Sequence, residues 1–161
     1  MHRGDMIMSM KGESWLVMVP SLLLLGINTR QDLKCREICL LTTMGMGVIG
    51  MLLQTVCWNK SISWCLEAAL PGLFLLFTSV LSGQKVGMGD GLSVLVLGIW
   101  SGMGAAAIAM MAGLFYICIW NLIAVRREMA DKGQEYPFLP FLTVGYLSWC
   151  AACLLLSVTH V

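Results

Sequence analysis

The sequence predicts an all-α, polytopic integral membrane protein, and three observations lead to this class. Of its 161 residues, 58% are hydrophobic and 12% are charged, whereas soluble domains carry roughly 25% charged residues. The mean hydropathy is +0.83. Long apolar runs alternate with short polar segments, as expected of helices that cross a bilayer. The whole chain, 1–161, is expected to form a single membrane-embedded domain.

The apolar runs predict about six transmembrane helices. Five hydrophobic stretches are visible, at about 14–28, 38–57, 62–82, 91–124 and 138–159. A helix crosses a bilayer in roughly 20 residues, so the fourth stretch is too long for one span. The glycines in Ser101-Gly102-Met103-Gly104 offer a break. The break leaves a short fourth helix at about 91–100 and a full fifth one at about 103–124.

The first apolar run is expected to be a retained helix, because it lacks an obvious small-residue cleavage site before Asn28. The seven cysteines lie mostly in apolar runs, where free cysteine acts as a small hydrophobe. An odd count without a compact pattern gives no case for a disulfide framework. Cys35 and Cys39 form one pair only, so neither a metal site nor a cofactor is expected.

The basic residues predict the orientation of the chain, because they are enriched in cytoplasmic segments. The segments after the first, third and fifth helices carry seven of them, and the opposite side carries three. The seven are Arg30, Lys34, Arg36, Lys85, Arg126, Arg127 and Lys132, and the three are Arg3, Lys11 and Lys60. Both termini are therefore expected outside, with Asp32 and Asp90 at the cytoplasmic face. The formal net charge of +1, without a basic stripe, argues against a nucleic-acid partner.

Two acids stand at the ends of apolar segments, where carboxylates are costly and usually functional. Asp32 follows the run that ends at Ile27, and Asp90 ends Gly87-Met88-Gly89-Asp90. Two carboxylates in close proximity share a proton, because neighbouring charge and desolvation raise one pKa. Such a pair activates water without a metal: the charged member takes a proton from water and the neutral member donates one to a carbonyl. Asp32 and Asp90 are therefore the predicted catalytic pair.

Gly87 and Gly89 are expected to shape the backbone around the pair. Glycine permits tight turns and positive φ, and it lets a substrate strand approach the main chain. The residues alone leave simpler alternatives open for each acid. Asp90 could be only the N-cap of the next helix, and Asp32 could belong to a solvated segment with intrahelical ion pairs.

Three motifs, which follow one another along the chain in the family's order, resemble the type IV prepilin peptidases, a family of GxGD intramembrane aspartyl proteases. Gly87-Met88-Gly89-Asp90 matches the GxGD motif. The segment from Asp32 to Ile38 resembles the family's other aspartate motif, an acid followed by basic residues. Tyr136-Pro137-Phe138-Leu139-Pro140-Phe141, followed by Gly145, resembles the start of its last helix. The chain length resembles the small members without an added cytoplasmic domain.

The resemblance implies an aspartyl endopeptidase that cleaves prepilin or pseudopilin leaders at the cytoplasmic face of a bacterial or archaeal cytoplasmic (inner) membrane. The substrate would carry a basic leader, often a glycine before the scissile bond, and then an apolar helix. The implied partners are this substrate and the lipid bilayer. Two departures are visible: Cys39-Leu40 stands where the family usually has Pro-Asn, and Gly91-Leu92-Ser93 where an aliphatic residue and a lysine are frequent.

Two other classes of function compete with this interpretation. In a small ion-coupled carrier, the aspartates would bind a cation or relay protons beside glycine-broken helices. In a non-catalytic membrane subunit, the fold would remain without the chemistry. A chain with no detectable inverted repeat leaves little room for alternating access, which favours the peptidase.

Overall fold

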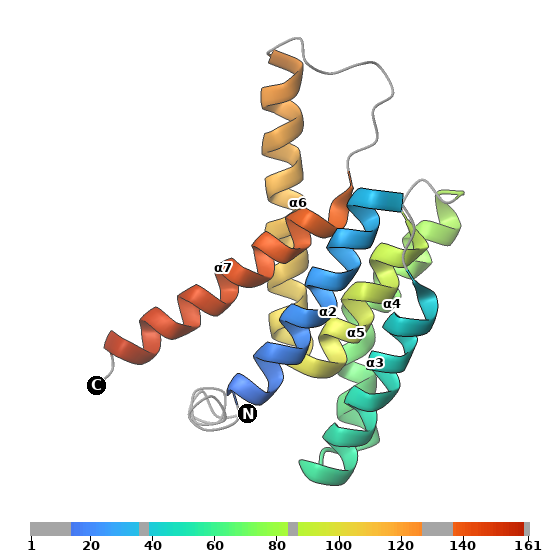
Figure 1. Cartoon of the computed structure of the whole chain (residues 1–161), viewed down its shortest axis with the longest axis vertical. Coiled ribbons are helices and arrows are strands. Elements are labelled where there is room, and N and C mark those ends of the chain that lie inside the picture. The colour runs from blue at the N-terminus through green and yellow to red at the C-terminus, as the bar shows by residue number, and fades with distance from the viewer. Residues whose placement is uncertain (1–13, 36–38, 84–86, 127–136, 160–161) are drawn as a thin grey trace.

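The computed structural model describes residues 14–35, 39–83, 87–126 and 137–159, and these residues are helical apart from short connections. The six α-helices of the described ranges are α2 (Ser14–Cys35), α3 (Leu40–Leu52), α4 (Ile62–Leu81), α5 (Met88–Ser101), α6 (Met103–Arg126) and α7 (Phe138–Thr159) (Figure 1). A π-helical segment, Leu53–Cys57, continues α3 directly. No β-strand occurs within these ranges, which confirms the predicted all-α class.

The predicted break in the long fourth stretch is confirmed. Helix α5 ends at Ser101 and α6 begins at Met103, with Gly102 alone between them. Gly102 has φ 85° and ψ 161°, a conformation that residues with a Cβ rarely adopt. One glycine therefore turns the chain from the short fourth helix into the longer fifth one.

The first helix is longer than the sequence predicted. An end near residue 28 was expected, but α2 continues to Cys35. The polar residues after Ile27 end the apolar run, yet arginine, glutamine, leucine and lysine are all good helix formers. Asp32 therefore lies on the last turn of a helix and not in the connection that follows it.

Within the described residues, four helical segments are long and apolar enough to cross a membrane, so the predicted six spans are not all confirmed. The four segments are Leu40–Cys57, Ile62–Leu81, Met103–Arg126 and Phe138–Leu156. Helix α5 is apolar but has only 14 residues, and α2 ends in polar ones. These helices are compatible with a multi-pass membrane protein, and the short α5 is the fourth α-helix among the described residues.

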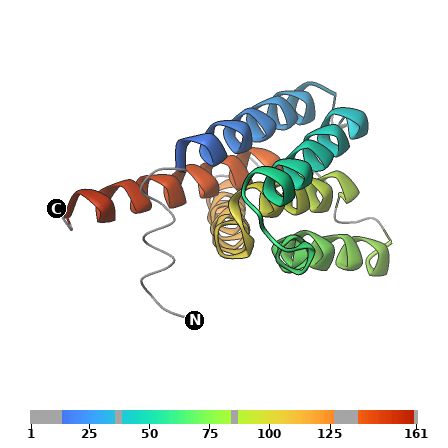
Figure 2. The same ribbon diagram turned by 90° about the horizontal axis from the view of Figure 1, so that it is seen from below.

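Helix α5 occupies the centre of the bundle. It contacts α2, α3, α4 and α6, and Figure 2 shows it between α2 and α3 on one side and α4 on the other. Eight of its 14 residues are buried. A helix surrounded in this way needs no lipid-facing stripe, which explains how a short helix is accommodated.

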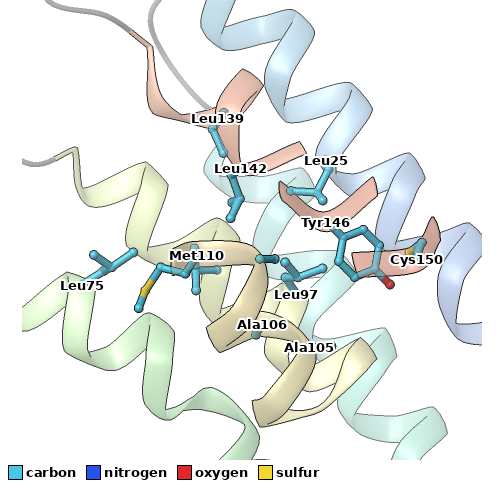
Figure 3. Packing of buried hydrophobic residues seen from close by; sticks show 12 residues of the cluster. Leu25, Leu75, Leu97, Ala105, Ala106, Met110, Leu139, Leu142, Tyr146 and Cys150 are labelled. Atoms are coloured by element: carbon cyan, nitrogen blue, oxygen red, sulfur yellow. The ribbon is translucent and has the colours of Figure 1, made fainter. Parts of the chain in front are cut away.

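The main core lies where α2, α5, α6 and α7 meet, and Leu75 of α4 joins it (Figure 3). Leu25, Leu97, Leu142 and Tyr146 are at most 1% exposed. In a bilayer, helices associate through close van der Waals packing and hydrogen bonds, because lipid is as apolar as leucine. Ser101 adds such bonds between three helices: its Oγ lies 2.9 Å from Ser21 Oγ and 2.8 Å from the Tyr146 hydroxyl.

Small residues allow the closest helix contacts. A Cβ on Gly72 of α4 would overlap the backbone of Leu95, and one on Gly98 of α5 would overlap the carbonyl oxygen of Ala68. Gly72 of α4 thus faces the α5 backbone, and Gly98 of α5 faces the α4 backbone. This is the backbone proximity that small residues permit in membrane bundles.

Helix α3 and its π-helical continuation are attached to α5 through Trp100. The Trp100 indole Nε1 donates to the carbonyl of Met46 at 3.1 Å, and Gln54 Nε2 donates to the carbonyl of Trp100 at 3.0 Å. Gln54 is buried, so this bond satisfies an amide that would otherwise be costly in an apolar interior. The two bonds hold the middle of α3 and the π-helical segment against α5.

Candidate active site

Asp32 and Asp90 come from different helices that meet at one end of the bundle. Asp32 lies on the last turn of α2 and Asp90 on the first turn of α5. The charge of Asp32 acts on Asp90, and side chains one turn deeper on the same two helices are hydrogen-bonded to each other. The two acids, 58 positions apart in the sequence, therefore share one region.

Asp90 is the third residue of α5, and Gly87 is the N-cap. The alternative that Asp90 is itself the N-cap is therefore wrong, although an acid in the first turn still interacts favourably with the helix dipole. A Cβ built on Gly87 would lie 3.0 Å from Asp90 Oδ2. The missing side chain at position 87 thus leaves room for the Asp90 carboxyl group at the helix start.

The backbone at the two motif glycines is ordinary. Gly87 has φ −62° and Gly89 is the second residue of α5, while positive φ among the described glycines is found at Gly83 and Gly102. The expectation that positive φ matters at 87 and 89 is not met. What Gly87 contributes is space beside Asp90.

The pKa of Asp90 is raised from 3.8 to about 7, first by burial and second by the charge of Asp32. Asp90 lies outside the four candidate spans. Burial raises a carboxyl pKa because the charged form loses its hydration, and a neighbouring negative charge acts in the same direction. Near neutral pH, Asp90 is therefore suited to hold a proton beside Asp32.

Asp32 is partly buried, and its Oδ2 atom is shielded from solvent. Its neighbour Gln31 connects α2 to the start of α3, because Gln31 Oε1 accepts a hydrogen bond from the backbone N–H of Cys39 at 3.0 Å. This bond involves Cys39, which stands where the type IV prepilin peptidases usually have Pro-Asn. Arg36 to Ile38 of the same motif, and Lys85, are outside the described residues.

A buried polar network lies one turn below the aspartates, and the sequence interpretation missed it. Asn28 Nδ2 donates to Ser93 Oγ at 3.0 Å, and Thr43 Oγ1 donates to Asn28 Oδ1 at 3.2 Å. All three side chains are at most 1% exposed. A signal was available, since Asn28 precedes Asp32 by four residues and Ser93 follows Asp90 by three, and both spacings lie on one helix face.

The third motif also reaches this end of the bundle. Pro137 precedes α7, and the hydroxyls of Thr29 on α2 and Thr143 on α7 lie 2.7 Å apart. Leu139 is fully buried in the core. The start of α7 thus lies beside the last turns of α2, which carry Asp32, whereas Tyr136 is outside the described ranges.

The two cysteines of α7 lie away from the aspartates. Cys150 and Cys153 lie in the second half of α7, and Cys150 is buried in the core cluster. Within the part of the chain that the structure describes, no three His, Cys, Asp or Glu side chains are grouped so that they could hold a metal ion.

The raised pKa of Asp90 predicts how stability depends on pH. The protonated group contributes its full stability below its ordinary pKa of 3.8, and that contribution is lost as pH rises through about 7. Asp90→Asn removes this titration, so its melting temperature relative to the unchanged chain should rise between about pH 4 and pH 7. Thermal unfolding in detergent micelles across this range measures the difference. A difference independent of pH would contradict the raised pKa.

In comparisons with known proteins, no family model, curated protein or solved structure matches the chain.

Proposed function

We propose that this chain is a membrane aspartyl endopeptidase of the prepilin leader peptidase type. The observation that carries the proposal is the meeting of Asp32 and Asp90 on adjacent helix ends, close enough for one charge to act on the other. The resemblance of the three motifs supplies the substrate class. The start of α7, which belongs to the third motif, contacts the same end of α2.

The two aspartates would have different roles at neutral pH. Asp90, with its pKa near 7, would hold the shared proton and donate it to the oxygen of the scissile carbonyl. Asp32 would accept a proton from water as the water oxygen bonds to the carbonyl carbon. The resulting gem-diol would collapse as the C–N bond breaks and the amine leaves with a proton from the pair.

Burial is a requirement of this chemistry, because a carboxyl group in water is ionised well below neutral pH. Gly87 leaves space for the Asp90 carboxyl group at the start of α5. The predicted cytoplasmic placement of this bundle end, in a bacterial or archaeal inner membrane, agrees with leader cleavage there. A basic leader followed by an apolar helix would place the scissile bond at the membrane edge.

The direct test is cleavage of a prepilin-like substrate. The chain would be co-expressed with several candidate prepilins in a bacterial host that lacks its own prepilin peptidase. The leader-cleaved product would be followed on a gel and its new N-terminus determined by mass spectrometry. Cleavage after the leader supports the proposal, and substitution of the glycine before the scissile bond should reduce it. Failure with every candidate, while the chain is folded in the membrane, would sink the peptidase assignment and favour the carrier or the subunit.

A further inference from the structure

The buried network of Asn28, Ser93 and Thr43 connects three helices directly below the aspartate pair. Asn28 lies on α2, Thr43 on α3 and Ser93 on α5. The Asn28 side chain uses its amide N–H toward Ser93 and its carbonyl oxygen toward Thr43. A single asparagine thus fixes the mutual placement of α2, α3 and α5 at this level of the bundle.

The network lies about one helical turn deeper in the bundle than the two acids. Asn28 is four residues from Asp32 and Ser93 is three from Asp90, so they lie about 6 Å and about 4.5 Å deeper along their own helices. The 3.0 Å bond from Asn28 to Ser93 therefore sets the separation of α2 and α5 one turn below the carboxyl groups. A change of separation there moves both carboxyl groups.

We propose that Asn28, Ser93 and Thr43 are positioning residues, whose hydrogen bonds hold α2 and α5 at the separation at which Asp32 and Asp90 act as a pair. The catalytic consequence rests on the proposed function, whereas the geometric claim does not. Polar side chains buried among apolar helices are costly unless they are bonded, and bonds between membrane helices specify how the helices pack. The network is buried and hydrogen-bonded, and it connects helices one turn below the acids, where the α2–α5 spacing affects their separation.

The chain offers a matched control on the same two helices. Ser101 of α5 shares a 2.9 Å hydrogen bond with Ser21 of α2, just as Ser93 accepts one from Asn28. Ser101 lies eleven residues from Asp90, about 16 Å along the helix axis. Ser93→Ala and Ser101→Ala therefore remove the same chemical group from α5, near the acids in one case and far from them in the other.

Thr43 offers a second pair of variants. Thr43→Val keeps the side-chain shape and removes the hydroxyl group that donates to Asn28. Thr43→Ser keeps the hydroxyl group and removes a methyl group. If Ser93→Ala fails to accumulate, the two Thr43 variants still test the proposal.

The first readout is the ionisation of Asp90, measured without any substrate. The infrared band of its protonated carboxyl group, identified by its loss in Asp90→Asn, would be followed against pH in detergent micelles. Ser93→Ala and Thr43→Val should lower the midpoint by about half a pH unit or more, because a wider α2–α5 spacing admits water and weakens the influence of Asp32. Thr43→Ser and Ser101→Ala should leave it unchanged.

Charged or ionisable groups other than Asp32 could also affect the ionisation midpoint of Asp90, so the test variants must leave them unchanged. At the ends of α2 and α6 and at the start of α3, they are Arg30, Lys34, Cys39 and Arg126, all exposed, together with Cys35 at the last position of α2. Farther from the acids, the described helices around α5 carry Cys57, Cys65, Glu67, Tyr116 and Cys118. The last turn of α4 and the two residues after it, 78–83, carry no ionisable side chain. None of the test variants changes any of these groups.

The second readout is cleavage of the prepilin-like substrate. Ser93→Ala and Thr43→Val should lower kcat about 10-fold or more with little change in KM, because small displacements of catalytic groups are costly. Thr43→Ser should restore most of the rate. Unchanged midpoints in Ser93→Ala and Thr43→Val would overturn the proposal, as would an equal shift in Ser101→Ala or an unchanged kcat in an active chain. A shift specific to the network, in a chain that cleaves nothing, would support the positioning role and sink the proposed function instead.

Discussion

Replacing Asp32 or Asp90 by asparagine is expected to reduce the rate of leader cleavage about 10³-fold or more, because each removes one half of the acid–base pair. Asparagine has nearly the same shape as aspartate but can neither accept a proton from water nor donate one to the carbonyl. The rate of appearance of the leader-cleaved product, at matched amounts of membrane-inserted protein, measures the loss. Because the two acids act as a unit, the double variant should be no slower than either single one.

A matched control separates loss of chemistry from loss of structure. Glu67 lies in the second turn of α4 and is exposed, so Glu67→Gln makes the same acid-to-amide change away from the pair. It should cleave at the unchanged rate. Cleavage that survives in Asp32→Asn or in Asp90→Asn would contradict the two-aspartate mechanism even if the chain proves to be a peptidase.

The second large effect is expected at the glycines between α4 and α5. Gly72→Ala and Gly98→Ala should each destabilise the folded chain by about 1–3 kcal/mol or more, because overpacking forces a shift of backbone atoms rather than of a flexible side chain. At both positions the atoms in the way include backbone, namely Leu95 for Gly72 and the Ala68 carbonyl for Gly98. The melting temperature in detergent micelles and the folded yield measure the effect.

The same substitution should have the opposite sign where space is open. A Cβ on Gly26 of α2 or on Gly45 of α3 would meet nothing within 4 Å. Alanine is the better helix former by up to about 1 kcal/mol, so Gly26→Ala and Gly45→Ala should leave stability equal or higher. If all four variants behave alike, the close contact of α4 with α5 is not a determinant of the fold.

The local properties of the chain could be predicted from its residues. The helix starts at 62 and 138, the break after Ser101 and the short fourth helix agree with the apolar runs and with Gly102. These are local features, because a helix depends on hydrogen bonds four residues apart and on the breaks that glycine permits. The end of the first helix was predicted too early, because an apolar run indicates the extent of burial in lipid and not the last helical residue.

Some features of the candidate site could likewise be predicted from the sequence, and others could not. Asp32, Asp90 and their resemblance to a known pair of motifs could be identified in the sequence, and so could the expectation that both face one side. The N-cap role of Gly87, the space it leaves beside Asp90 and the network of Asn28, Thr43 and Ser93 could not. They depend on which faces of α2, α3 and α5 meet, and no periodicity within one helix specifies its neighbour.

A helical chain of membrane type, with two acids at helix ends, could thus be inferred from the residues. That those ends meet, that the short α5 is the centre of the bundle, and that Asn28 bonds to Ser93 below the acids became known from the folded arrangement. The physical reason is the range of the interactions. Helix formation and lipid preference depend on residues a few positions apart, whereas the approach of α5 to α4 depends on Gly72 and Gly98. These two glycines are far apart in the chain, and each meets the other helix only after folding.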